Sequence, residues 1–342
     1  MLQAENNTYY ADDCDEIMGP RHIWLTTVAT VLENIFIVFG ILANLICFLL
    51  FCRAKLRSRL GLLLGSLAVG DILFLISSIP YQAVQWGEIL RSKLIYNPAL
   101  KTAVYTMVSS SILHTICMWL IVAAIANRLY SVGCARCCCA ARICTILSIF
   151  VVVLYGIWVN LFNFFRRVVV MKRSDCPSDS EAYVPTLDFP REGVLHDFVQ
   201  TQERSHVYAD LIVPNACIFV LSLILSICLC CCMKRDRSDR CGDFAKMVVA
   251  LGFICWVMNW IPAGLAKTER YNAEFLHHNL HLYAVFRCAA HAITVLLFST
   301  KFLIYFSFSP LFRHEALVVL GCRKHRDYQV ISSKTEQMHH YI

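Results

Sequence analysis

Seven apolar stretches, each about as long as a membrane-spanning helix, divide the 342-residue chain. About 20 predominantly apolar residues form a helix that crosses the roughly 30 Å hydrocarbon core of a bilayer. Because lipid offers the backbone no hydrogen-bond partner, a helix is the expected form of each stretch. The predicted fold class is an all-α membrane protein, a seven-transmembrane helix bundle. The stretches are Ile23–Cys52, Gly61–Trp86, Ala99–Val132, Ile143–Phe165, Val207–Met233, Phe244–Ala266 and Leu280–Phe306.

The composition excludes several classes of protein. Hydrophobic residues make up 58% of the chain and charged residues only 16%, which is unlike a soluble domain. The net charge of +7 is modest, and no nucleic-acid-binding motif accompanies it, so we expect no nucleic-acid partner. No HExxH, GxSxG or phosphate-loop motif is present, so we expect neither an enzyme nor a cofactor.

The distribution of Lys and Arg predicts the orientation of the chain. Basic residues are dense in the loops at 53–59 and 234–240 and in the tail at 323–326. Loops rich in Lys and Arg remain in the cytoplasm, so the C-terminus is expected inside and the N-terminus outside. The outer side then holds the acidic N-terminal tail and the long fourth loop. It also holds Asn6, which begins a glycosylation sequon.

Residues 309–322 have the pattern of a short amphipathic helix, which would be helix 8 when counted after the seven predicted spans. Leu311, Phe312, Leu317 and Leu320 gather near one face, as in a helix that lies in the membrane interface. Cys322 follows it and is a candidate palmitoylation site. We therefore predict three parts: an extracellular tail (1–22), a transmembrane domain (23–306), and the amphipathic helix with a cytoplasmic tail (307–342).

Arg128 lies where the third stretch is about to leave the bilayer. Two interpretations are open. The side chain of an Arg at a helix end can simply extend to the interface. A charge inside the membrane can instead mark a functional position, because it is costly to keep there.

Several motifs around Arg128 occur in a fixed order. They are Asn44, Leu67-Ala68-Val69-Gly70-Asp71, Asn127-Arg128-Leu129, Pro214, Asn259-Trp260-Ile261-Pro262 and Lys301-Phe302-Leu303-Ile304-Tyr305. Together they resemble the motifs of a rhodopsin-like (class A) G-protein-coupled receptor, in which Asp/Glu-Arg-Tyr, Cys-Trp-x-Pro and Asn-Pro-x-x-Tyr stand at these places. Within that class, Phe302 and the segment 160–166 resemble invertebrate neuropeptide receptors of the FMRFamide/myosuppressin type.

The resemblance implies a multi-pass receptor of the plasma membrane that passes the binding of an extracellular peptide to a heterotrimeric G protein. The residues implied for the switch and for G-protein coupling are Asp71, Asn127, Arg128, Trp260, Pro262, Lys301 and Tyr305. An alternative within the same fold is a small-molecule chemosensory receptor. A transporter or channel would predict inverted repeats or broken helices, which the sequence does not show.

Two of these positions depart from the family pattern. Asn127 replaces the acid that usually pairs with the motif Arg, so the restraint on Arg128 is expected to be weaker. Lys301 replaces the usual Asn or Asp and faces Asp71 of the second helix. Because an unpaired buried charge costs several kcal/mol, we expect these two side chains to pair. The alternative is a Lys301 that points toward other helices.

The outer cysteines also differ from the family. The helix-three position that usually forms a disulfide is Ala103, which leaves Cys14 and Cys176 as cysteines of the outer segments. We expect these two to form a disulfide in an oxidising space; the alternative is two unpaired or intermolecular thiols. Two further cysteine clusters lie on the predicted inner side, and they suit palmitoylation or packing better than a metal. They are Cys134, Cys137, Cys138 and Cys139, and Cys228, Cys230, Cys231 and Cys232.

Alignment on the motifs predicts the lining of a ligand pocket. The expected residues are Glu33, Tyr81, Ser110, His114, His206, Asp210, Trp260, Arg287 and His291, with Trp260 as the floor. A polar rim of this kind favours a peptide, and Ser110 in place of an acid argues against a monoamine. Glu33 and Asp210 suit a basic ligand, whereas Lys267 and Arg287 suit an acidic one, and both remain open.

Overall fold

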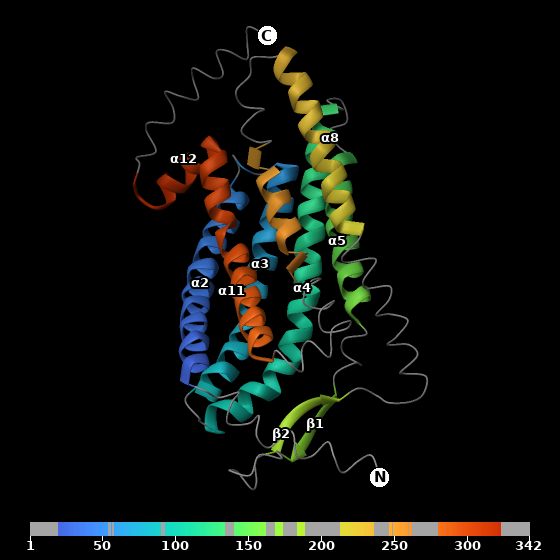
Figure 1. Cartoon of the computed structure of the whole chain (residues 1–342). Coiled ribbons are helices and arrows are strands. Elements are labelled where there is room, and N and C mark those ends of the chain that lie inside the picture. Colours follow the sequence, from blue (N-terminus) through green and yellow to red (C-terminus); the bar gives the residue numbers. More distant parts are fainter. Residues whose placement is uncertain are drawn as a thin grey trace, which may run out of the picture.

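The structure is a computed structural model and is built almost entirely of long helices (Figure 1). It describes residues 20–53, 56, 58–89, 93–133, 140–161, 168–173, 183–188, 213–235, 246–247, 249–258, 260–261 and 280–322. The labelled helices are α2 (Pro20–Cys52), α3 (Arg59–Ile89), α4 (Lys93–Gly133), α5 (Ala140–Asn160), α8 (Val213–Arg235), α11 (Leu280–Phe308) and α12 (Pro310–Val319).

Five of these helices are long and apolar enough to cross a membrane. The candidate spans are Thr27–Cys52 in α2, Arg59–Trp86 in α3, Val108–Asn127 in α4, Ile143–Asn160 in α5 and Ala289–Phe308 in α11. The fifth and sixth predicted stretches coincide with two shorter apolar helices, Val213–Leu225 in α8 and Val249–Met258. This is the build of an all-α, multi-pass membrane protein, with five candidate spans among the described residues.

Small residues bring the helices of the bundle close together. A Cβ added to Gly40 of α2 would lie 2.4 Å from the hydroxyl oxygen of Ser299 on α11. A Cβ on Gly70 of α3 would lie 2.7 Å from the sulfur of Cys117 on α4, and Gly156 of α5 meets α4 equally closely. Without a hydrophobic driving force between helices in lipid, such close packing is a main source of association.

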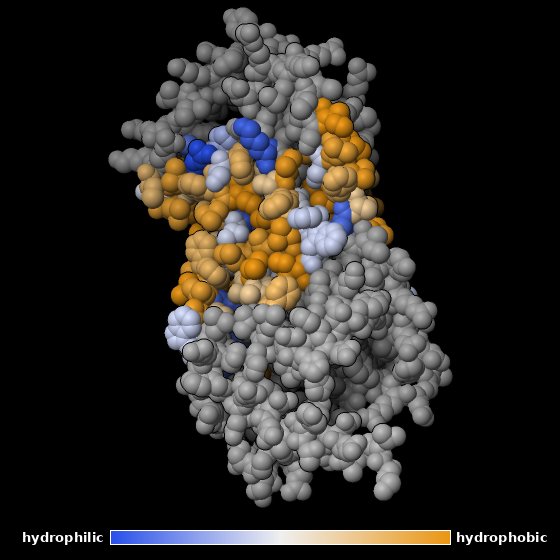
Figure 2. Space-filling model, in the orientation of Figure 1, coloured by the Kyte–Doolittle hydropathy of each residue, from blue (hydrophilic) through white to orange (hydrophobic). Residues whose placement is uncertain are grey.

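Large apolar side chains cover the outside of the bundle. Ile35 and Val38 of α2 are 56% and 60% exposed, and Phe150 and Val151 of α5 are 59% and 61% exposed. Figure 2 shows apolar side chains, in orange, gathered across the middle of the face in view. In a soluble protein such a surface would be a liability, whereas here it suits contact with acyl chains.

Helix α12 begins and ends with well-formed caps. The Ser309 hydroxyl accepts a hydrogen bond from the amide of Phe312, and Pro310 fills the first turn. At the other end Gly321 adopts φ 74°, and the amide of Cys322 donates to the carbonyl of Leu317 at 2.9 Å. This glycine-dependent stop is a Schellman motif. The helix covers the segment for which the sequence predicts an amphipathic helix.

A β-hairpin that was not predicted from the sequence interrupts the order of helices. Strands β1 (Val168–Arg173) and β2 (Tyr183–Asp188) pair antiparallel, with Val168 opposite Asp188. The hairpin lies within the fourth connection, at the end of the bundle opposite α12 (Figure 1). Helix α5 also ends at Asn160, five residues before the predicted end of the fourth stretch.

Candidate functional site

Two clusters of buried polar side chains lie inside the bundle, and both join α2, α3 and α11. The first, called the Asp71 cluster, consists of Asn44, Asp71, Ser299 and Lys301. The second, called the Glu33 cluster, consists of Glu33, Tyr81, Gln82 and His291. Both contain polar or charged groups that are costly to keep in a membrane unless they have partners.

The Asp71 cluster contains an ion pair, as the sequence predicts. The Lys301 Nζ donates to Asp71 Oδ1 at 2.6 Å, and the two side chains are 0% and 1% exposed. Removal of two charges from water is expensive, and only a close contact with further polar partners offsets the cost. The pair therefore fixes α11 against α3 at one register.

Aromatic and amide groups support this ion pair. The Lys301 Nζ lies 4.5 Å from the centre of the Phe298 ring, which is a cation–π contact. The same ring stacks on Phe74 at 3.8 Å, with 11° between the planes. The Asn44 Nδ2 donates to the Phe298 carbonyl at 3.1 Å, so α2 is tied to the same point of α11.

The Asp71 cluster continues toward α12 through Tyr305, one turn after Lys301. Tyr305 is 1% exposed, and its ring packs on Phe51 and Phe312 with centroid distances of 5.4 Å and 5.6 Å. Its hydroxyl has no hydrogen-bond partner among the described residues. Arg53, two residues after Phe51, forms a 3.3 Å ion pair with Glu315 of α12.

The Glu33 cluster lies nearer the opposite end of the bundle. Glu33 is 1% exposed, and its Oε2 accepts a short hydrogen bond from the amide nitrogen of Gln82. The same oxygen lies 3.1 Å from Nδ1 of His291, whose side chain is 27% exposed. The His291 ring packs against Tyr81 with 4.7 Å between centroids. Three of the predicted pocket residues therefore meet in space.

Other predicted pocket residues lie at different places. The Ser110 hydroxyl lies 2.7 Å from the hydroxyl of Ser77 on α3, and the His114 ring lies 6.0 Å from that of Phe298. His114 therefore lies near the Asp71 cluster, whereas Ser110 lies on α4 beside the part of α3 between the two clusters. Trp260 is 56% exposed and packs on Trp256 at 6.0 Å, which is more exposed than the pocket floor that the sequence predicts there.

Some predictions fall on residues that the structure describes partly or not at all. Arg128 and Arg287 belong to α4 and α11, but their side chains are outside the described part, and Asn127 is half-buried. Cys322 is exposed after the end of α12. The predictions that lie outside the described residues concern Asn6, Cys14, Cys176, His206, Asp210 and Pro262.

Sequence reasoning missed the partners that α2 and α3 exchange around Glu33. Gln82 and Gln85 lie three positions apart on α3, as do Thr30 and Glu33 on α2. The Thr30 hydroxyl donates to Gln85 Oε1 at 3.0 Å, one turn from the Glu33 contact. Residues three positions apart share one face of a helix. A polar pair at this spacing in each of two apolar helices was therefore the signal that these two faces meet.

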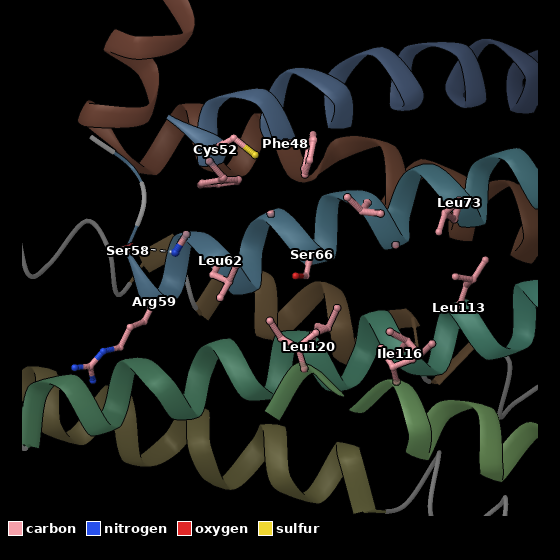
Figure 3. A pocket seen from close by; sticks show the side chains of 17 residues that line it. Phe48, Cys52, Ser58, Arg59, Leu62, Ser66, Leu73, Leu113, Ile116 and Leu120 are labelled. Carbon is pink, nitrogen blue, oxygen red and sulfur yellow. Dashed lines mark hydrogen bonds between the residues drawn. The ribbon is translucent and has the colours of Figure 1, made fainter. Parts of the chain in front are cut away.

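A large groove also lies between α2, α3, α4 and α5 (Figure 3). Its volume is about 1010 Å³, and most of its lining is apolar, with Ser58 and Arg59 at one end. Val69 and Leu73 of its wall are 38% and 47% exposed on the apolar outer surface. The groove therefore opens toward lipid, and neither polar cluster lines it.

No protein-family model matches this chain, and no curated protein is significantly similar to it. The resemblance to receptors therefore depends on the sequence motifs alone.

Proposed function

We propose that the chain is a G-protein-coupled receptor for a neuropeptide. In this proposal α8 and the helix Val249–Met258 complete five spans to seven. The N-terminus is outside, which places the Glu33 cluster toward the extracellular side and α12 along the cytoplasmic face. The concentration of Lys and Arg at 53–59, 234–240 and 323–326 supports that orientation.

The single observation that carries the proposal is the buried ion pair of Lys301 and Asp71. It joins two spans in the interior of the bundle, and Tyr305 continues the contact to the cytoplasmic helix α12. A buried charge pair strongly constrains the position of one helix against another. A transmembrane bundle that switches between two packings needs constraints of this kind, so that each packing is well defined. Simple membrane anchoring requires no such pair.

The mechanism that follows is a shift between two packings of the helices. A ligand at the outer end stabilises one packing only by its greater affinity for that packing. The proposed change moves α11 against α2 and α3 and repacks Tyr305 and Phe312. Arg128 at the cytoplasmic end of α4 then contacts the G protein.

The test is a neuropeptide-library screen of cells that express the chain with a promiscuous G-protein reporter. We expect at least one peptide to give a saturable response that Arg128→Ala abolishes at equal surface expression. Arg59→Ala is the matched control, because it removes an Arg from the same predicted membrane side. Peptide-evoked ionic current without a G-protein response, or an unchanged response in Arg128→Ala, would overturn the proposal.

A further inference from the structure

Two buried acceptor oxygens in the Glu33 cluster have no donor. Glu33 Oε1 and Gln82 Oε1 each have less than 1 Å² exposed and no hydrogen-bond partner among the described residues. Both side chains are 1% exposed and belong to one hydrogen-bonded pair. A buried acceptor without a donor loses its hydration and receives nothing in return.

The neighbouring side chains do not correct this deficit. Gln82 and His291 both approach Glu33 through Oε2, so Oε1 lacks a donor whether the imidazole is charged or neutral. Thr30, one turn away, uses its hydroxyl to donate to Gln85. The cluster therefore contains a carboxylate and an amide that together still need at least two donors.

We propose that the Glu33 cluster binds a cationic group with several hydrogen-bond donors, a guanidinium or an ammonium of the extracellular ligand. Such a group carries five or three N–H donors and a positive charge. It would donate to Glu33 Oε1 and Gln82 Oε1 together. The inference rests on the proposed function, because it takes the outer end of the bundle as the ligand side.

The aromatic side chains favour an organic cation over a metal ion. Tyr81 and His291 pack with their rings 4.7 Å apart beside the carboxylate, and the face of a Tyr ring attracts guanidinium and ammonium groups. Among the described residues no three His, Cys, Asp or Glu side chains converge to hold a metal. The side chain of His291 is 27% exposed, so the cluster is not closed on that side.

Lys267 and the side chain of Arg287, which suit an acidic ligand, lie outside what the structure describes, whereas Glu33 meets its partners directly. The basic group of the ligand is assigned to the seam between α2, α3 and α11, where Glu33 lies.

The test measures the apparent melting temperature of the purified full-length protein in detergent micelles. The probe is methylguanidinium at millimolar concentrations, with neutral methylurea and sodium chloride as matched controls. We expect a saturable rise with methylguanidinium and none with methylurea or sodium. In Glu33→Gln the half-saturating concentration should rise about tenfold or more, as loss of a charge-assisted hydrogen bond implies.

Glu315→Gln is the matched variant, because it neutralises another buried carboxylate, at the α12 end of the bundle, and should keep the wild-type shift. If Glu33→Gln does not yield folded protein, Gln82→Met is the second variant. It removes the other acceptor and should also weaken binding of methylguanidinium. An equal shift with methylurea, stabilisation by sodium alone, or an unchanged shift in Glu33→Gln would overturn the inference. No G protein is needed for this measurement, so its failure is distinct from a failure of the receptor assay.

Discussion

Removal of Lys301 should damage the bundle more than removal of any exposed charge. In Lys301→Met the chain keeps a side chain of similar length but leaves Asp71, 1% exposed, without its cation. Loss of one partner of a buried pair costs about 3–5 kcal/mol, because the remaining charge is desolvated and unpaired. Loss of the cation–π contact with Phe298 adds about 1 kcal/mol.

The second variant removes the stranded charge as well. Asp71→Asn combined with Lys301→Met leaves a neutral amide in place of the carboxylate. The remaining deficit is about one lost hydrogen bond, or ~1 kcal/mol. The double variant should therefore be more stable than Lys301→Met alone, although it carries one more substitution.

The assay is unfolding of the purified proteins in one detergent, followed by heat and by denaturant, for wild type, both single variants and the double variant. The coupling energy between the two positions should be about 2 kcal/mol or more. Additive effects of the two substitutions, or a Lys301→Met protein as stable as wild type, would refute the paired, buried arrangement.

Three further outcomes follow from other contacts. Gly40→Ala should lower stability by about 1–3 kcal/mol, because its Cβ would stand 2.4 Å from a serine oxygen of α11; Gly65→Ala, with its nearest contact at 3.5 Å, should be neutral in the same melting assay. Phe312→Ala should cost about 3–5 kcal/mol and reduce G-protein coupling at equal surface expression, because the ring is 1% exposed. Arg53→Ala should cost only about 1 kcal/mol in thermal unfolding, since Arg53 is 44% exposed although Glu315 is buried.

The sequence predicted the helices where hydropathy alone determines them. Helices α2, α3 and α11 lie within a few residues of the predicted stretches, because about 20 apolar residues in lipid have few alternatives to a helix. Charge also made one contact predictable. Lys301 and Asp71 are 230 positions apart, and both lie in apolar helices where an unpaired charge is costly.

The Glu33 cluster was predictable only in part. Glu33, Tyr81 and His291 were expected to line a pocket, but the hydrogen bond between Glu33 and Gln82 depends on the rotation of α2 against α3. Apart from the polar pairs Thr30/Glu33 and Gln82/Gln85, hydropathy is nearly uniform around these helices and says little about their rotation. The hairpin β1–β2 was missed although its first strand begins with Val168-Val169-Val170, a β-branched run that is typical of a strand.

The two clusters share helices, and this gives the bundle a physical route between its ends. His291 and Lys301 are ten positions apart on α11, or about 15 Å along the helix axis. Each contacts a carboxylate on a different helix, α2 for His291 and α3 for Lys301. A movement of α11 that lengthens one contact must change the other, because a helix transmits displacement along its axis as a nearly rigid element. Because the Lys301 pair is buried, solvent does not replace a lost partner. Partial separation of the pair is therefore costly, which favours discrete packings over gradual distortion. A ligand that changes the surroundings of Glu33 therefore acts on a part of the bundle that also contains the Asp71 ion pair.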